Sequence, residues 1–283
     1  MSTINGKKPL RIIKQGIYEN DVRRISDTES VANAFMLTTD FEGSISLTFK
    51  NDTFEITDAK WGIHRAPDMD RRGEGTADML IGDSAYTGDR RNHIKVLPDY
   101  SAGQTETPED PKAVSPEWKH IRELYLEALR GALQAEYYLL KDRGFKDIID
   151  YEESWDSDCR PYHLDPPAVD EWPIYVGAFD HFRVRDLYNK YLQMNLIDNG
   201  DETVTALGTY NDSFHEMSTC FVFNKADGVI TDFSLNHLRV PFKSCHDFQE
   251  LTKRDVGKLI GGSYGCFHFV DIIYDLVEMA AEL

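Results

Sequence analysis

Long apolar runs are missing from this sequence. None approaches the roughly 18 residues that a membrane-spanning helix needs. The segment from Met1 to Arg11 also lacks the apolar core of a secretory signal. The four cysteines are too few to form a disulfide framework in a chain of 283 residues. We therefore expect a cytoplasmic protein with reduced thiols.

Familiar cofactor motifs and excess positive charge are missing as well. There is no Gly-x-Gly-x-x-Gly after a strand, no phosphate-binding loop, no His-Glu-x-x-His and no Gly-x-Ser-x-Gly. We expect no obligatory nicotinamide, flavin or ATP cofactor. The formal net charge of −18 repels phosphate backbones and anionic lipids, which argues against nucleic acid and membranes as partners. The 41% hydrophobic content is that of an ordinary globular protein.

The most informative pattern that is present is an internal repeat. An Ile-Thr-Asp motif at 56–58 leads to Arg-Ala-Pro at 65–67, and a second one at 230–232 leads to Arg-Val-Pro at 239–241 with the same spacing. Each follows a strand-like run that ends in a phenylalanine, Phe49 or Phe223. The pattern predicts two diverged copies of one β-rich unit, related by a pseudo-two-fold.

Periodicity and turn residues predict the elements around this repeat. Strands are expected at 44–49, 54–63, 213–223 and 228–240, and helices at 116–143, 182–194, 246–258 and 264–282. Ser115 can cap the long helix at its start, and Gly144 can end it. Strands followed by helices, twice and without βαβ alternation, indicate an α+β fold. We expect a first β-rich copy at 1–110, a linker and long helix at 111–145, and a second copy at 146–283.

Each predicted copy places an arginine at the end of an otherwise apolar strand face. These residues are Arg65 and Arg239, and His237 lies on the same face as Arg239. Because arginine cannot lose its charge, such a residue needs a partner anion. The anion is either a protein carboxylate, in a structural ion pair, or the carboxylate or phenolate of a ligand.

Thiols and imidazoles gather near the last predicted helix. A glycine-rich segment at 261–265 precedes Cys266 and His268, and Cys245-His246 lies upstream. Three interpretations stay open. The cysteines are small buried hydrophobes, or they bind zinc with His268 (and Cys159 or His163), or a thiol or imidazole acts as base or nucleophile. The spacing matches no standard zinc pattern, and we predict no metal.

The C-terminal half resembles an uncharacterised bacterial family, the domain of unknown function numbered 2889. The resemblance covers mainly residues 213–283 and rests on the motifs at 230–232 and 239–241, on Cys245, and on Leu-Ile-Gly-Gly at 259–262 running into Gly-Cys-Phe-His at 265–268. Phe267 and Phe269 stand where threonine and leucine are expected. The family has no agreed activity, and its members are common in bacteria that degrade aromatic compounds, which implies aromatic substrates.

Together these features suggest a cofactor-independent lyase. Elimination, deformylation or decarboxylation of a small aromatic or carboxylated substrate is expected. Arg239 and Arg65 would bind the anionic group, and His237, His246 or His268 would move the proton, with Tyr264 as a phenol partner. The alternative is a non-catalytic subunit of a larger assembly that binds a ligand or a metal. In either case the chain can form a homo-oligomer.

Overall fold

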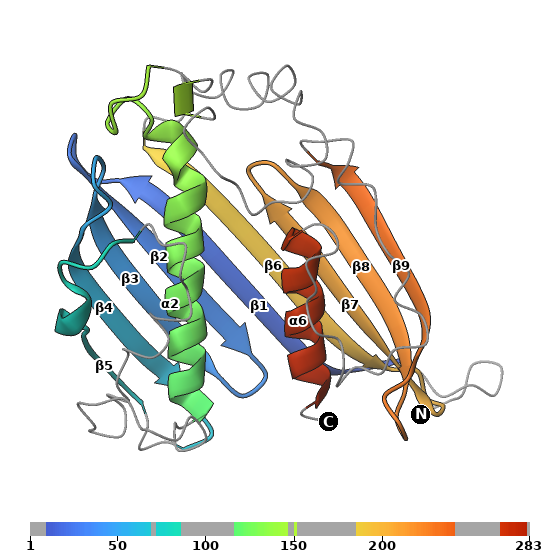
Figure 1. Ribbon diagram of the computed structural model, residues 1–283. Coiled ribbons are helices and arrows are strands. Elements are labelled where there is room, and N and C mark those ends of the chain that lie inside the picture. The colour runs from blue at the N-terminus through green and yellow to red at the C-terminus, as the bar shows by residue number, and fades with distance from the viewer. Residues whose placement is uncertain are drawn as a thin grey trace. The chain divides into compact units, whose positions relative to one another are not determined.

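The structure is a computed structural model that describes residues 10–68, 72–85, 116–146, 150–151, 185–240 and 267–281. In these residues nine strands form one sheet in the order β5-β4-β3-β2-β1-β6-β7-β8-β9 (Figure 1). The strands are β1 (Arg11–Arg24), β2 (Glu29–Thr38), β3 (Glu42–Lys50), β4 (Ile56–Arg65), β5 (Gly73–Thr76), β6 (Asp186–Asp198), β7 (Thr203–Asp212), β8 (Glu216–Asn224) and β9 (Ile230–Arg239). The helices are η3 (Asp78–Leu80), α2 (Pro116–Ala135), η6 (Glu136–Tyr138) and α6 (Phe267–Ala281).

The α+β fold class predicted from the sequence is wrong. That prediction had two separate β-rich copies with flanking helices in a pseudo-two-fold arrangement, whereas all the described strands belong to one large antiparallel sheet and the fold is β-rich. The error has an identifiable cause. Strands β1 and β6, which stand between β2 and β7 in the strand order, were not recognised as strands.

The segment predicted as a helix at 182–194 is largely strand β6. Its buried side chains alternate from Tyr188 through Lys190, Leu192 and Met194 to Leu196, which is the period of a strand. A lysine at a buried position broke the apolar alternation, so the sequence pattern looked helical. The buried ammonium group of Lys190 needs a counter-charge, and the structure provides one.

That counter-charge is Glu127 on helix α2. The Lys190 ammonium donates to the Glu127 carboxylate, and Arg130 pairs with the same group. Burial raises the pKa of Glu127, but the charges of Arg130 and Lys190 lower it by more than burial raises it. The pKa therefore lies well below its usual value. Glu127 is therefore a buried carboxylate that stays charged.

Two compact units account for the described residues. The first holds 18–68, 72–85, 116–146, 150–151 and 185–190, and the second holds 10–17, 191–240 and 267–281. In the first unit α2 packs on β2, β3 and β4, and in the second α6 packs on β7 and β8. The domain boundaries predicted from the sequence stay a prediction.

Each helix buries one apolar face, as the periodicity of the sequence predicted. On α2 the buried face includes Trp118, Ile121, Leu124, Tyr125, Ala128 and Leu129, and on α6 it includes Ile272, Ile273, Leu276, Val277 and Ala280. Gly144 has a φ of +86°, which confirms the left-handed glycine predicted after the first helix. The regular α-helix nevertheless ends earlier, at Ala135, and continues as η6 and turns.

The Ile-Thr-Asp motif of the first unit forms a β-bulge. Phe49 on β3 lies opposite Ile56 on β4, and Thr48 lies opposite Asp58, so Thr57 is the extra residue of β4. The Thr57 hydroxyl donates to the carbonyl oxygen of Thr48 at 3.4 Å. The motif thus consists of a buried isoleucine, a threonine that is the inserted residue of the bulge, and an aspartate at which the strand pairing resumes in the shifted register.

The motif of the second unit forms the same bulge. Phe223 lies opposite Ile230, Val222 lies opposite Asp232, and the hydroxyl of the extra residue Thr231 donates to the Val222 carbonyl at 3.3 Å. The predicted equivalence of the two motif-bearing strands is confirmed by this shared register. Their predicted placement in a pair of sheets is wrong, because both belong to one sheet.

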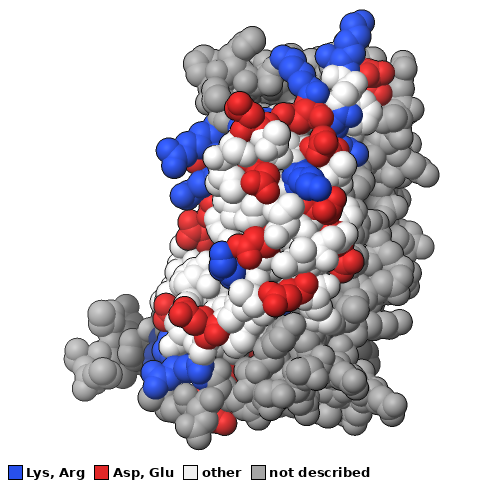
Figure 2. Space-filling view, turned by 90° about the vertical axis from the view of Figure 1, so that its left-hand side faces the viewer, with Lys and Arg blue, Asp and Glu red and all other residues white. Residues whose placement is uncertain are grey.

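The surface on the side of β4 and β5 shows mixed charge. Acidic and basic side chains are interspersed there with uncharged residues, and no large patch of one sign is visible in this view (Figure 2). Within the described part of the chain, no helix has both the length and the apolar composition to cross a membrane.

Candidate functional site

The candidate site is built on the turn between β7 and β8. This turn comprises Asp212, Ser213, Phe214 and His215. One oxygen of the Asp212 carboxylate accepts hydrogen bonds from the backbone N–H groups of Phe214 at 2.7 Å and His215 at 2.6 Å. The Asp212 N–H donates to the His215 carbonyl at 2.9 Å. Aspartate commonly closes turns in this way, and here its side chain fixes the backbone at His215.

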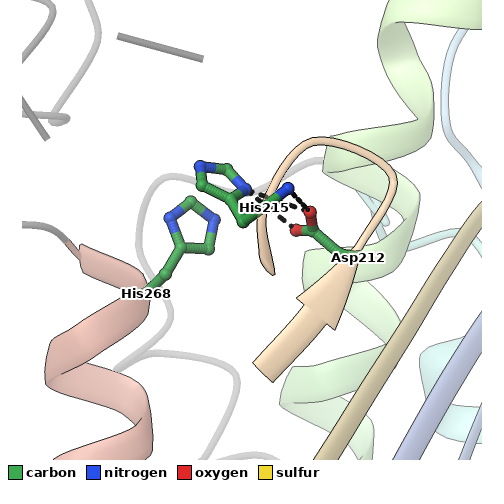
Figure 3. A group of neighbouring side chains, drawn as sticks. All are labelled: Asp212, His215 and His268. Atoms are coloured by element: carbon green, nitrogen blue, oxygen red, sulfur yellow. Dashed lines mark hydrogen bonds and ion pairs between the residues drawn. The ribbon is translucent and has the colours of Figure 1, made fainter. Parts of the chain in front are cut away.

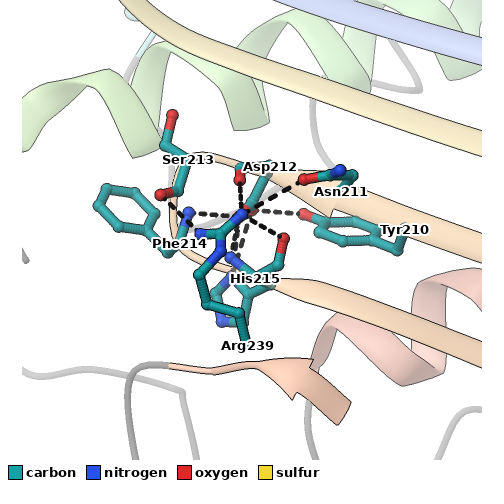
Figure 4. A network of polar contacts seen from close by, with 7 residues as sticks. All are labelled: Tyr210, Asn211, Asp212, Ser213, Phe214, His215 and Arg239. Carbon is teal, nitrogen blue, oxygen red and sulfur yellow. Dashed lines mark hydrogen bonds and ion pairs between the residues drawn. The ribbon is translucent and has the colours of Figure 1, made fainter. Parts of the chain in front are cut away.

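The same carboxylate binds the imidazole of His215. Nδ1 of His215 lies 3.0 Å from Oδ1 and 3.2 Å from Oδ2 of Asp212. The Tyr210 hydroxyl donates to Oδ2 at 2.9 Å (Figure 4). The side chains of Asp212 and His215 are only 0% and 5% exposed, so water does not compete with these bonds.

The Asp212 carboxylate is charged at neutral pH. Burial by itself raises the pKa of Asp212, but the charge and hydrogen bond of His215 lower it more, with help from His268 and the Phe214 N–H. The resulting pKa of Asp212 lies far below its ordinary value. A buried, charged carboxylate therefore lies against an imidazole.

A second imidazole comes from helix α6. His268, the second residue of that helix, has its ring centroid 3.8 Å from that of His215 and 5.3 Å from that of Tyr210. Asp212, His215 and His268 each offer a potential metal-ligand atom, and these atoms all lie within 4.8 Å of one another (Figure 3). Two imidazoles and a carboxylate are donors that suit zinc and related transition metals. We refer to these three residues as the Asp-His-His cluster.

Arg239 holds the backbone of this turn. Its guanidinium donates to the carbonyl oxygens of Ser213 at 2.9 Å, Asp212 at 2.9 Å and His215 at 3.2 Å (Figure 4). A fourth contact, at 3.3 Å, goes to the side-chain oxygen of Asn211. The partner of Arg239 is therefore a set of turn carbonyls, in place of the protein carboxylate or ligand anion that we expected. Anion binding by Arg239 stays a prediction.

Arg65 has the same arrangement in the first unit. It donates to the carbonyls of Thr38 at 2.6 Å, Thr39 at 2.8 Å and Phe41 at 3.4 Å, in the turn between β2 and β3. Its contact with the Glu42 carboxylate is longer, 3.8 Å, and both side chains are substantially exposed. The end of each strand thus supplies an arginine that binds the neighbouring hairpin turn.

The other residues predicted for the site are only partly placed by the structure. Of the predicted imidazoles, His268 lies in the cluster, and His237 is half-buried on β9, opposite Met217 in the register. Further candidates lie outside the described residues: His246, Tyr264, Cys245, Cys266, Cys159 and His163. The roles proposed for them from the sequence stay predictions.

Three residues of the site were missed by the sequence analysis: Tyr210, Asp212 and His215. The sequence pattern predicts one strand from Ser213 to Phe223, which places His215 within a strand, whereas the structure has it at the end of a turn. Asp-Ser is typical turn chemistry, and the spacing of the repeat aligns this segment with the turn at Thr38–Phe41. Those two signals together could have located the turn and its histidine.

Comparison with protein-family models, with curated proteins and with solved structures finds no match to this chain. The resemblance to the domain of unknown function numbered 2889 stays a prediction.

Proposed function

We propose that this protein binds a divalent transition metal, with zinc as the first to test, at the Asp-His-His cluster. The observation that carries the proposal is the convergence of three metal-binding groups within 4.8 Å. They come from a hairpin turn and from the first turn of a helix far away in the sequence. Two imidazoles and one carboxylate leave a coordination position for water or a ligand, as catalytic metal sites do.

Burial supports the proposal. His215 and Asp212 are nearly inaccessible, and His268 is half-buried, so the cluster lies at the edge of the interior with one imidazole reachable from outside. A solvated acidic patch offers many weak carboxylates, whereas this site offers two imidazoles, which bind zinc through nitrogen. The buried charge of Asp212 favours a cation beside it.

The direct test is metal content. The protein is purified without metal-affinity resin, and zinc is measured by mass spectrometry before and after dialysis against zinc. We expect stoichiometric zinc in the wild-type protein. His215→Ala and His268→Ala should bind zinc at least about 100-fold more weakly, because each loses a ligand and changes behind the ligands already cost about 10- to 100-fold. His120→Ala is the matched control, because His120 is also a histidine near the start of a helix and its ring packs on Phe41.

The test also has outcomes that refute the proposal. Wild-type protein that takes up no zinc, cobalt or nickel at micromolar concentration would refute it. Retention of zinc by both histidine variants would place the metal elsewhere. Cobalt substitution addresses the thiol hypothesis separately: a thiolate-to-cobalt absorption band that disappears in Cys245→Ser or Cys266→Ser would add sulfur to the ligands.

A second candidate function is metal-free acid–base catalysis. The observation that favours it is the hydrogen bond from Nδ1 of His215 to Asp212, the arrangement that orients a histidine base in many hydrolytic enzymes. Under this proposal the lyase reaction on a small aromatic or carboxylated substrate, in the cytoplasm, would use His215 as its base. Activity that survives chelation and is lost in His215→Ala would favour it over the metal site.

A further inference from the structure

We infer that Asp212 and Tyr210 are positioning residues of the proposed metal site, and that His215 coordinates the metal through Nε2. This inference rests on the proposed metal function. It assigns Asp212 a place behind His215 instead of on the metal, and it gives Tyr210, which was not part of the cluster, a role in metal affinity.

The hydrogen bonds of Asp212 account for its whole accepting capacity. A carboxylate has about four lone-pair sites. The backbone N–H groups of Phe214 and His215 take two of them on Oδ1, the Tyr210 hydroxyl takes one on Oδ2, and Nδ1 of His215 lies against both oxygens. A metal on Asp212 would have to displace one of these donors. No displacement is needed at the outer nitrogen of His215.

The same bonds set the tautomer of His215. Nδ1 can bond to a charged carboxylate only by donating a proton, so neutral His215 carries its hydrogen on Nδ1 and its lone pair on Nε2. Carboxylates that bind the far nitrogen of a histidine in this way are common behind metal ligands, where they fix the ring and increase its basicity. Asp212 therefore acts on a metal through His215.

Tyr210 completes the arrangement. It is buried, and its ring makes edge contacts with the rings of His215, at 6.2 Å, and His268, at 5.3 Å. The corresponding register position of the first unit holds Met36, opposite Gly43 as Tyr210 is opposite Met217. Of these two equivalent positions, only the one beside the Asp-His-His cluster carries a hydroxyl, and that hydroxyl donates a hydrogen bond to Asp212.

Tyr210→Phe separates the two possible roles of Asp212 by the sign of its effect. If Asp212 positions His215, loss of the hydroxyl loosens the carboxylate, and the dissociation constant for zinc, measured by competition with a chromophoric chelator, should rise about 10-fold. If Asp212 were itself a ligand, the substitution would free an oxygen lone pair, and zinc would bind as tightly or more tightly. That result would overturn the inference. Tyr125→Phe, which removes another buried hydroxyl, should leave zinc affinity unchanged.

A metal-free measurement distinguishes failure of the inference from failure of the proposed function. Nitrogen-15 NMR of the imidazoles in the apo-protein should show the hydrogen of His215 on Nδ1, with a shift toward the other tautomer in Tyr210→Phe. A wild-type His215 protonated only on Nε2 overturns the inference whether or not zinc binds. Wild-type protein that has the expected tautomer and takes up no metal refutes the metal function alone and leaves the positioning of His215 by Asp212 and Tyr210 standing.

Discussion

The turns at Thr38–Phe41 and Asp212–His215 are closed by the same backbone hydrogen bond and have different side chains. In each, the first side chain accepts hydrogen bonds from the last two N–H groups: Thr38 from Asp40 and Phe41, and Asp212 from Phe214 and His215. In each, an arginine from the end of the adjacent strand binds the turn carbonyls. A helix histidine then packs on the last residue, His120 on Phe41 and His268 on His215.

The two turns differ in side-chain groups that are not needed to close the turn. A threonine hydroxyl closes the first turn as well as a carboxylate closes the second, and a phenylalanine supports the helix histidine as well as an imidazole does. The charge of Asp212 and the ring nitrogens of His215 are therefore additional to what the turn needs. These additional groups support the proposed metal site at the second turn.

The largest effect concerns the helices that pack beside the turns. Helix α2 buries the charged residue Glu127 against Lys190, whereas the buried residues described on α6 are apolar. Glu127→Gln leaves Lys190 buried without its counter-charge, and we expect a loss of about 3–5 kcal/mol in the free energy of unfolding by urea at pH 7. Glu123→Gln, at a more exposed position of α2, should cost less than about 1 kcal/mol.

This effect should depend on pH with a defined sign. Folding lowers the pKa of Glu127 from 4.5 to about 2, so its stabilisation is complete above pH 4.5 and is lost as the pH falls toward 2. The difference between the wild-type and Glu127→Gln proteins should therefore be constant from pH 8 to about pH 5 and shrink below it. A difference that grows in acid would contradict the assignment of a charged buried carboxylate.

Exchange of the residues that distinguish the turns comes next. His215→Phe gives the second turn the residue of the first, and zinc affinity measured by calorimetry should fall at least about 100-fold because a ligand is lost. Folding should be little affected, since a phenylalanine occupies this place at residue 41. Phe41→His supplies the reciprocal variant, and we expect no zinc binding there at micromolar concentration, because Thr38 provides no carboxylate to fix the ring of the new histidine and increase its basicity. Zinc binding by Phe41→His would remove the distinction between the turns.

The arginines should matter equally in both units. Arg65→Lys and Arg239→Lys replace a planar group that reaches several carbonyls with a single ammonium, and each should lower the free energy of unfolding by about 1–2 kcal/mol. Zinc affinity of Arg239→Lys should change by less than that of Tyr210→Phe. A stable Arg239→Lys variant that has lost ligand binding would instead restore the anion-binding role predicted from the sequence.

The smallest effects should come from the bulge threonines. Thr231→Val removes one hydrogen bond to a partly solvated carbonyl, and we expect a loss of about 0.5 kcal/mol. Thr57→Val should cost about 1 kcal/mol, because the single Thr57 hydroxyl proton lies closer to the Glu29 carboxylate, at 3.0 Å, and hydrogen bonds to charged groups are stronger. Equal losses in chemical denaturation would show that the Glu29 contact contributes nothing.

Part of the fold could be predicted from the sequence because some of its signals are local. Turn residues and alternation located the strands around Phe49 and Phe223, and helical spacing located α2 and α6. Strand β6 was missed because Lys190 interrupts its apolar alternation, and the reason for that lysine is Glu127, 63 residues away in sequence. A compensation between distant residues leaves no trace in a window of ten to fifteen residues.

The candidate site was less readable for the same reason. His268 was identified because a glycine-rich segment and a helix start surround it in the sequence. Asp212 and His215 carry no local sign of chemistry, since an aspartate and a histidine three residues apart in a turn are commonplace. Only the approach of α6 to this turn makes them a cluster, and that approach depends on tertiary packing of residues such as Ile272 and Leu276 on the β7–β8 strands.

The way in which these turns are held has a practical consequence for protein engineering. Because Thr38 and Asp212 both accept the turn N–H bonds through a side-chain oxygen, we expect that the first and last side chains of the two turns can be exchanged with little effect on the scaffold. The double substitution Thr38→Asp with Phe41→His would place a carboxylate and an imidazole beside the existing His120, on a backbone already shaped for them. The hairpin of the first unit is thus a ready host for a transplanted binding site, in which function can be introduced without redesigning the fold.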